Sequence, residues 1–184
     1  MQEVGNPVDY MNRYDSPLGA ITLGSDGRSL TGLWFDGQKR FAATLCEEHE
    51  EGKLPVFEDA ARWLDTYFEG KEPDFTPQLA LRGSAFCRKV WEVLLTIPYG
   101  QTMTYGEIAR ILAARQGLGK MSARAVGGAV GRNALSIIIP CHRVVGAQGS
   151  LTGYAGGIDR KLKLLSLEGV DTTRFSLPKT GSAL

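Results

Sequence analysis

The strongest constraint on the fold is a change in hydrophobic spacing near the middle of the chain. Three short runs of strand-forming residues come first, at 10–14, 20–24 and 30–35. Turn signals separate these runs, and the pattern predicts a small antiparallel meander. Gly70, Pro73 and Pro77 then interrupt regular structure, and from Ser84 onward apolar residues recur at helical spacing. We therefore expect two dissimilar parts joined by a linker at about 70–83.

One helix is predicted to complete the first part. After an acidic stretch, apolar residues recur three and four positions apart, at Phe57, Ala60, Leu64, Tyr67 and Phe68. This spacing gives a helix one apolar face, which should pack on the sheet. Residues 1–83 are thus expected to form an α+β domain together with its linker.

The second part reads as a series of helices. Apolar residues from Phe86 to Ile97 share a face, and a Pro-Tyr-Gly stop follows at 98–100. Thr104 and Glu107 form a capping box at the start of the next helix, and a third helix begins near Ser122. Two helices joined by a short turn suggest a helix-turn-helix unit.

The third helix has an unusual face made of small residues and one arginine. This face consists of Ala123, Arg124, Gly127, Gly128 and Gly131. Each glycine inside a helix costs about 1 kcal/mol relative to alanine, so the set needs a reason. One reason is close packing against another helix, and the other is close approach to a nucleic-acid backbone. The single arginine favours the second reading.

The charge of the chain divides along the same boundary. Residues 1–83 carry 8 Lys/Arg against 15 Asp/Glu, a net charge of −7, whereas residues 84–184 carry 13 against 5, a net charge of +8. Such a basic half suggests a polyanionic partner, although two domains that simply solvate themselves with opposite charges would give the same count. The three cysteines, the lack of an export signal and the lack of a long apolar run lead us to expect a cytoplasmic protein with free thiols.

The chemistry is expected around Cys141. A reactive thiol needs a neighbouring base, and the chain has two histidines, His49 in an acidic segment and His142 next to the cysteine. Ile137, Ile138 and Ile139 are expected to form a buried extended run leading into Cys141. Neighbours on an extended strand point to opposite faces, so adjacency alone leaves Cys141 open to a purely structural role.

Glu168 is a candidate partner for the histidine. It follows Lys161, Leu164 and Leu165 at helical spacing, with Gly169 at the helix end. A glutamate in a last helical turn faces the negative end of the helix dipole, so a specific partner would explain it; an exposed helix-end glutamate is the alternative. With such a partner, Cys141, His142 and Glu168 would act as nucleophile, base and orienting group.

Residues 105–169 resemble the 6-O-alkylguanine-DNA alkyltransferase family, also called the methylated-DNA–protein-cysteine methyltransferases. The matching motifs are Tyr105, Ala123-Arg124-Ala125-Val126-Gly127, Asn133, Ile139-Pro140-Cys141-His142-Arg143-Val144, Gly153-Tyr154-Ala155-Gly156-Gly157, and Lys161 through Leu164-Leu165 to Glu168-Gly169. The first half agrees through 16–19 and its general plan. The resemblance implies an α+β chain: a small N-terminal antiparallel sheet with a helix, ribonuclease H-like, and then an all-helical, winged-helix-like DNA-binding domain at 84–175. A flexible tail is expected at 176–184.

The resemblance also implies a function. An alkyl group would move from the 6-oxygen of guanine, or from the 4-oxygen of thymine, to Cys141 once, after base flipping. The partner would be double-stranded DNA containing alkylated guanine, bound through the minor groove by a monomer, without a membrane, cofactor or metal. The implied roles are Arg124 as an inserted finger, with Ala123, Gly127, Gly128 and Gly131 close to DNA; Tyr105 as proton donor; Asn133 as a brace; and Val144, Tyr154, Ala155 and Gly156 as pocket walls.

Two departures from the family pattern and three rival functions stay open. The segment 113–121 is longer than in short family members, and Ala134 stands where the family usually has proline. The rivals are a non-catalytic alkylguanine-DNA-binding protein, a cysteine hydrolase and a helix-turn-helix regulator. Cys46 and His49 have the spacing of a metal-ligand pair, but no second pair completes it, and a solvated face is expected there.

Overall fold

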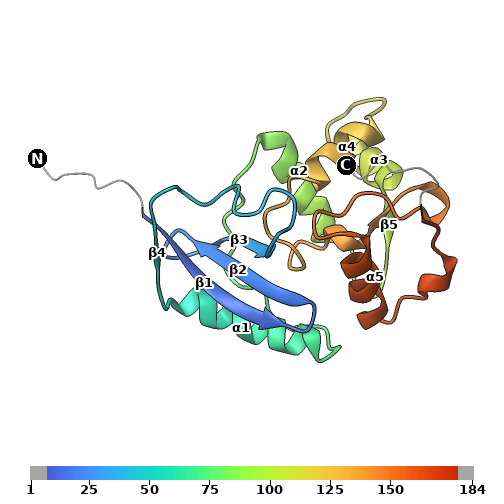
Figure 1. Cartoon of the computed structure of the whole chain (residues 1–184). Coiled ribbons are helices and arrows are strands. Elements are labelled where there is room, and N and C mark those ends of the chain that lie inside the picture. Colours follow the sequence, from blue (N-terminus) through green and yellow to red (C-terminus); the bar gives the residue numbers. More distant parts are fainter. Residues whose placement is uncertain (1–7, 178–184) are drawn as a thin grey trace, which may run out of the picture.

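The computed structural model describes residues 8–177 and begins with a four-stranded sheet (Figure 1). Its strands are β1 (Asp9–Ser16), β2 (Gly19–Ser25), β3 (Leu30–Phe35) and β4 (His49–Glu51), in the order β3-β2-β1-β4. The first three strands form the predicted antiparallel meander, while β4 adds a short parallel pairing to β1. Every residue of β3 is buried, so this strand lies in the core.

Helix α1 (Pro55–Phe68) packs against the sheet, as its apolar spacing predicts (Figure 1). Pro55 stands at the start of the helix, where a missing backbone N–H costs nothing. Phe57, Leu64 and Tyr67 are buried on the face toward the sheet. Burying such side chains stabilises the domain by about 1.5–3 kcal/mol each.

The second part contains α2 (Ala85–Leu94), α3 (Tyr105–Arg115), α4 (Ala123–Val130) and α5 (Ile158–Leu167). Side chains of Ser84, Thr104 and Ser122 cap the first three, and Glu107 completes the predicted capping box. Two short strands, β5 (Met103–Thr104) and β6 (Val144–Val145), pair in parallel within this otherwise helical part. Among the described residues, no helix is long and apolar enough to cross a membrane.

The two parts share one hydrophobic core. The amide of Leu33 in β3 donates to the carbonyl of Ala134 at 2.8 Å, and the amide of Ser136 donates back to Leu33 at 3.0 Å. Residues 78–80 of the predicted linker also pair with β3 through Leu30. The segments 78–80 and 134–136 both bond to backbone N–H and C=O groups of β3 that would otherwise lack partners. The two parts are therefore joined by backbone hydrogen bonds as well as by packing.

The prediction of an extended run at Ile137–Ile139 is wrong. These residues are buried, but they form compact turns, with Ile137 at a φ of +69°. The amides of Ile138 and Ile139 donate to Ser136 and Leu135 at 2.8 and 3.0 Å. The three adjacent isoleucines correctly predicted a buried segment. They did not predict its backbone conformation, because branched apolar residues are buried in cores outside strands as well as in them. The following 3₁₀ turn at Cys141–Arg143 also removes the strand alternation expected for Cys141 and His142.

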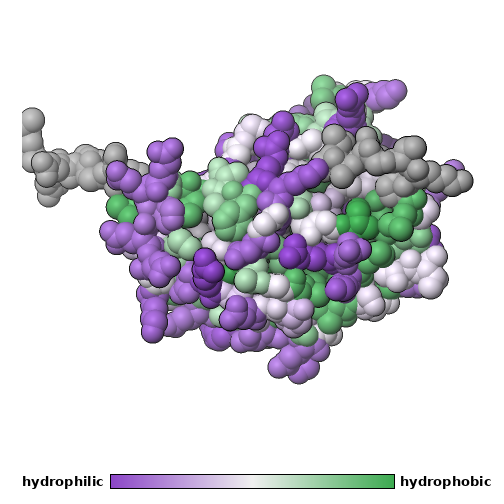
Figure 2. All heavy atoms as spheres, viewed as in Figure 1, coloured by the Kyte–Doolittle hydropathy of each residue, from purple (hydrophilic) through white to green (hydrophobic). Residues whose placement is uncertain are grey.

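The last described residues lie on the face near α5. Ser176 pairs with Ser150, and the amide of Leu151 donates to the carbonyl of Ser176 at 2.9 Å. The rest of the predicted tail, residues 178–184, lies outside the described residues. Figure 2 shows hydrophilic side chains over the β1 and β4 end of the molecule, and hydrophobic side chains gathered on the side of α5.

Candidate active site

Cys141 opens the buried 3₁₀ turn and has 5% of its surface exposed. The side-chain amide of Asn133 donates to its Sγ at 3.2 Å. Burial raises the pKa of the Cys141 thiol, although the Asn133 hydrogen bond and the positive charge of Lys161 act in the opposite direction. A protonated thiol at this depth needs a base before it can act as a nucleophile.

His142 is fully buried and can supply that base. Its Nε2 lies 2.6 Å from Oε1 of Glu168, and because a carboxylate only accepts, Nε2 carries the proton. Its Nδ1 is buried and has no hydrogen-bond partner among residues 8–177, so its lone pair is available. Burial lowers the pKa of His142, although the nearby Glu168 carboxylate acts to raise it. The lowered pKa keeps the imidazole neutral at neutral pH.

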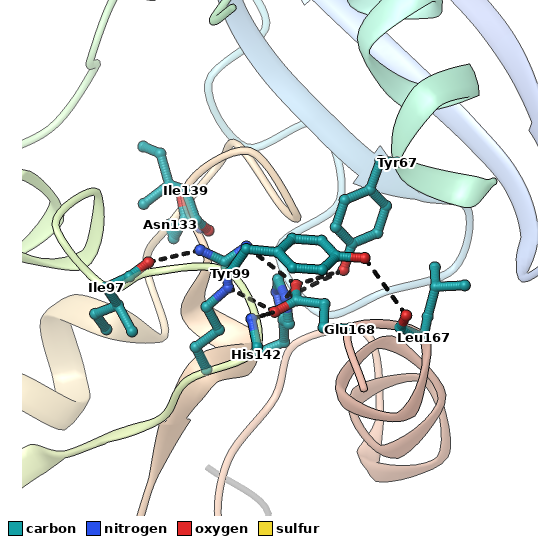
Figure 3. Close-up of polar contacts among 10 residues, drawn as sticks. Tyr67, Ile97, Tyr99, Asn133, Ile139, His142, Leu167 and Glu168 are labelled. Carbon is teal, nitrogen blue, oxygen red and sulfur yellow. Dashed lines mark hydrogen bonds and ion pairs between the residues drawn. The ribbon is translucent and has the colours of Figure 1, made fainter. Parts of the chain in front are cut away.

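Glu168 caps α5, and hydrogen-bond donors from three further segments converge on its carboxylate (Figure 3). Arg143 donates Nε to Oε2 at 2.8 Å and Nη2 to Oε1 at 3.1 Å, and the amide of Gly100 donates to Oε2 at 3.0 Å. Tyr67 donates to Oε1 at 2.7 Å. Burial acts to raise the pKa of Glu168, but the His142 and Arg143 contacts outweigh it and hold the pKa at about 2. The carboxylate is therefore an anion at any physiological pH.

Gly100 explains part of the stop signal at 98–100. Its φ is +72°, and a Cβ at this position would lie 2.9 Å from the backbone oxygen of Glu168. Only glycine combines this left-handed conformation with such a close approach to a backbone atom. The helix stop thus also delivers an N–H to Glu168.

Asn133 holds the turn that presents the cysteine. Its Oδ1 accepts from the Leu135 amide at 2.9 Å, and its Nδ2 donates to the carbonyl of Ile139 at 2.9 Å. These bonds span the compact segment that precedes Cys141. Ala134, the departure from the family pattern, lies inside this held segment and pairs with β3 through its carbonyl.

A cavity of about 480 Å³ lies between α3, α4 and two loops. Cys141, His142 and Glu168 are not among the residues that line it, but Tyr105 lines it and interacts electrostatically with Cys141. Tyr105 and Ala155 are in its lining, as are Ala123, Arg124, Gly127 and Gly131 from the α4 face. The Tyr105 hydroxyl donates to the carbonyl of Thr152 at 3.1 Å. Burial raises the pKa of Tyr105 to about 12, so this phenol stays protonated at neutral pH.

The α4 face points to solvent rather than to another helix. Val126, Ala129 and Val130 are buried on the opposite side, whereas Arg124 and Gly128 are exposed. A Cβ built on any glycine of this face would meet its nearest neighbour at an ordinary distance: 3.7 Å for Gly127, 3.4 Å for Gly128 and 3.5 Å for Gly131. Close helix packing therefore does not explain the glycines.

The other expected pocket residues lie behind the cavity lining. Val144 is fully buried in β6, and Tyr154 is 7% exposed. Gly156 packs beneath the ring of Tyr154, because a Cβ there would come within 2.7 Å of that ring. Of the four residues expected to form pocket walls, Ala155 is the one that lines the cavity.

The sequence assigned no role in the site to five residues that the structure places around it: Lys39, Arg40, Tyr67, Arg143 and Lys161. Lys39 and Arg40 line the cavity from the loop after β3. Lys161 is fully buried and donates to the carbonyls of Val144 and Thr152 at 2.5 and 3.1 Å, and burial lowers its pKa to about 8. A lysine among apolar residues of one helical face was the available signal for Lys161.

Two family models match the chain and together cover most of it. Residues 10–81 match the ribonuclease-like domain of 6-O-methylguanine DNA methyltransferase, and residues 85–170 match its DNA-binding domain. Three relatives are described as methylated-DNA–protein-cysteine methyltransferases. The chain is 46% identical to the one from Mycobacterium leprae over 157 residues (84% of this chain, 88% of the relative), and 46% identical to that from Mycobacterium tuberculosis over 154 residues (84% and 88%). It is 43% identical to the one from Methanosarcina acetivorans over 162 residues (87% and 98%).

Solved structures agree with this result. The crystal structure of Mycobacterium tuberculosis OGT in complex with DNA superposes with a TM-score of 0.76 at 43% identity, covering 90% of this chain and 94% of that one. An O6-methylguanine DNA methyltransferase from Methanococcus jannaschii superposes with a TM-score of 0.57 at 28% identity, covering 92% and 100%. The fold and the order of its two domain types are common to all three chains.

Proposed function

Because the chain belongs to the 6-O-methylguanine DNA methyltransferase family, we propose that it repairs DNA by moving an alkyl group from the 6-oxygen of guanine to Cys141. The observation that supports this most directly is the Asn133, Cys141, His142 and Glu168 cluster, which Tyr105 connects to a cavity lined by the α4 face. The cluster can ionise a thiol, and the cavity can receive a base. The same chemistry would accept a 4-alkylthymine.

The α4 face is proposed to approach double-stranded DNA through the minor groove. Its glycines leave room for the DNA backbone, and the exposed Arg124 can occupy the place of an extruded base. The basic charge of residues 84–184 supplies attraction to phosphates. A cavity of about 480 Å³ is large enough for a nucleobase, and the protein is proposed to work as a monomer.

The alkyl transfer would begin with removal of the thiol proton and end with protonation of the released guanine. His142 Nδ1 accepts the thiol proton of Cys141 through a bridging water, while Glu168 holds the Nε2 proton. The sulfur attacks the alkyl carbon, a C–S bond forms, the C–O bond breaks, and the electron pair goes to the guanine oxygen. Tyr105 donates a proton to the departing guanine and is then reprotonated as His142 gives up the proton that it took from the thiol, so that in total the thiol proton replaces the alkyl group.

The product thioether makes the reaction a single event. A thioether lacks the good leaving group of an acyl-enzyme, so water has no easy way to release the alkyl group from sulfur. A cysteine hydrolase would instead release many products per protein molecule. Counting products against protein thus separates these two functions.

The two remaining alternative functions differ from alkyl transfer in the sequence preference of DNA binding or in whether the Cys141 thiol becomes modified. A helix-turn-helix regulator would prefer one sequence, whereas this protein is expected to bind with little sequence preference and to lose affinity steeply with salt. Binding titrations on unrelated duplexes at several salt concentrations measure this. A non-catalytic reader of alkylated guanine would leave Cys141 unmodified.

The decisive experiment compares the native protein with Cys141→Ala on DNA carrying 6-O-methylguanine. Mass spectrometry should show one methyl group on the native Cys141 peptide, and the variant should bind DNA as the native protein does while transferring nothing. Repaired DNA together with an unmodified Cys141 peptide would contradict the proposal.

A further inference from the structure

Tyr67 connects the N-terminal part of the chain to the Glu168 carboxylate. It lies on α1, and Glu168 follows 101 residues later in the chain. The Tyr67 hydroxyl donates to Oε1 of Glu168 at 2.7 Å and lies 3.3 Å from Nε2 of His142. Figure 3 shows this side chain reaching from α1 toward the carboxylate at the end of α5. A residue of the ribonuclease-like half thus reaches the group that orients the histidine.

Packing explains the ring of Tyr67 but not its hydroxyl. The ring stacks on Trp63 at a centroid distance of 5.3 Å and meets Phe68 and Tyr99 edge-on. Phenylalanine would make the same ring contacts. A fully buried hydroxyl is unfavourable unless it has a partner, and here the partner is an anion that other groups also hold. Burial raises the pKa of Tyr67 well above its ordinary value, so the hydroxyl remains a donor.

The direction of the hydroxyl determines what it can do. Oε1 is the oxygen that faces Nε2 of His142, and it also accepts from Nη2 of Arg143; Oε2 accepts from Nε of Arg143 and from the Gly100 amide. Tyr67 adds a donor to Oε1 from α1, and together with the two Arg143 bonds it restrains the rotation of the carboxylate about its last bond. That rotation keeps the proton on Nε2 and leaves Nδ1 free to take the Cys141 proton.

We propose that Tyr67 is a positioning residue for alkyl transfer, through which the N-terminal domain holds the Glu168–His142 pair in its working geometry. The inference rests on the proposed function, since it names a further residue of the same site. It also gives the ribonuclease-like domain a direct part in the reaction.

Tyr67→Phe removes the hydroxyl and keeps the ring. Loss of one hydrogen bond to a charged group should slow single-turnover methyl transfer about 5- to 10-fold at neutral pH. The acidic limb of the pH–rate profile should also move to higher pH. Without the donor, the pKa of Glu168 rises, the more basic carboxylate raises the pKa of His142, and transfer requires a neutral imidazole. The ionisable groups around this pair are Tyr67, Tyr99, Cys141, Arg143, Tyr154 and Lys161.

Tyr14→Phe is the matched control. Tyr14 of β1 donates to the carboxylate of Asp65 on α1 at 2.8 Å, which is also a bond from a tyrosine hydroxyl to a carboxylate but lies at an exposed position. Its transfer rate and acidic limb should match those of the native protein. Thermal unfolding and DNA affinity of both variants should show that the Tyr67→Phe protein is folded and still binds DNA.

The outcomes separate this inference from the function on which it rests. A native rate and a native acidic limb in Tyr67→Phe would overturn the inference, as would equal losses in the two tyrosine variants. A native protein that transfers no methyl group to Cys141 would overturn the proposed function itself. Slower transfer with a shifted acidic limb in Tyr67→Phe alone supports the inference.

Discussion

At the scale of single residues, the site depends on keeping one charge and one neutral base side by side. Glu168 stays anionic because His142 and Arg143 outweigh the effect of its burial, whereas His142 stays neutral because burial outweighs Glu168. A buried carboxylate with several donors cannot lose its charge without leaving those donors unpaired. The thiol of Cys141 thus has a neutral acceptor at neutral pH.

Glu168→Gln tests this charge arrangement. The amide cannot hold the Nε2 proton of His142 as the carboxylate does, and it leaves Arg143 without its counter-charge, so methyl transfer should fall at least about 100-fold. The same change should lower the free energy of unfolding by about 3–5 kcal/mol, because it breaks a buried ion pair. Single-turnover kinetics and urea unfolding measure the two effects.

Glu92→Gln provides the comparison for that variant. Glu92 is exposed on α2, so its replacement should leave both the transfer rate and the unfolding midpoint nearly unchanged. Methyl transfer at the native rate by Glu168→Gln would show that the Glu168 carboxylate does not orient His142 for the reaction.

At the scale of elements, α4 combines a buried support with an open face. Trp91 of α2 donates to the carbonyl of Ala129 at 2.9 Å and anchors the helix from behind. Its outer face is kept bare by three glycines that no neighbouring helix requires. The turn before it, at 116–122, contains the exposed Leu118 and a positive φ at Gly117. The segment 113–121 thus ends α3 and forms most of this turn, and Ser122 caps α4 directly after it.

Gly128→Ala separates helix stability from DNA approach. The new methyl group would meet the flexible end of Arg132 at 3.4 Å, so the fold can accept it. Helix propensity should then raise the free energy of unfolding by up to about 1 kcal/mol. DNA affinity should fall several-fold, because the methyl group keeps the backbones apart. Thermal unfolding and a binding titration would check this, and unchanged affinity would count against α4 as the DNA-facing helix.

At the scale of the whole molecule, a second ion pair with a buried carboxylate ties the sheet to the linker. Arg82 donates to both oxygens of Asp9 at 2.6 and 2.7 Å, and the Cys46 amide donates to Oδ2 at 2.8 Å. The Arg82 hydrogen bond is the main reason that the pKa of Asp9 is lowered to about 2. Because Asp9 starts β1 and Arg82 precedes α2, this pair stabilises the connection between the two parts.

Asp9→Asn should therefore destabilise the protein in a pH-dependent way. A carboxyl whose folded pKa lies below its unfolded value of 3.8 contributes stability above that value and loses it as the pH falls through about 2. The free energy of unfolding of the native protein should exceed that of the variant by about 2 kcal/mol at pH 7, and this difference should shrink from pH 4 downward. Urea unfolding at pH 7, 4 and 3 measures it.

Asp15→Asn serves as the control, because Asp15 is exposed on the same strand. This variant should unfold at nearly the native midpoint across the same pH range. A constant difference between native and Asp9→Asn proteins at all three pH values would show that the carboxylate charge is not what Arg82 stabilises.

The sequence by itself determined the local elements and the chemistry-bearing residues. Period-two and helical spacing report which side chains a strand or helix buries, and this is how the meander, α1 and the bare face of α4 could be predicted. The capping box at Thr104 depends on a residue only three positions away, so it could also be predicted from the sequence. None of Cys141, His142 and Glu168 was decisive by itself, and the three could be named together because the surrounding motifs resemble a known family.

Only the tertiary structure decided which distant groups meet. The Tyr67 hydroxyl reaches Glu168 across 101 residues, and Lys161 bonds the carbonyls of Val144 and Thr152 from another segment. Periodicity reports that such side chains are buried, but the polar partner of a buried group depends on how the two parts dock. The turn at Ile137 was missed for the same reason, since burial alone does not fix backbone geometry. The sequence thus pointed to Cys141 as the proposed nucleophile, and only the tertiary structure brought the Tyr67 hydroxyl of α1 to Glu168 at the end of α5.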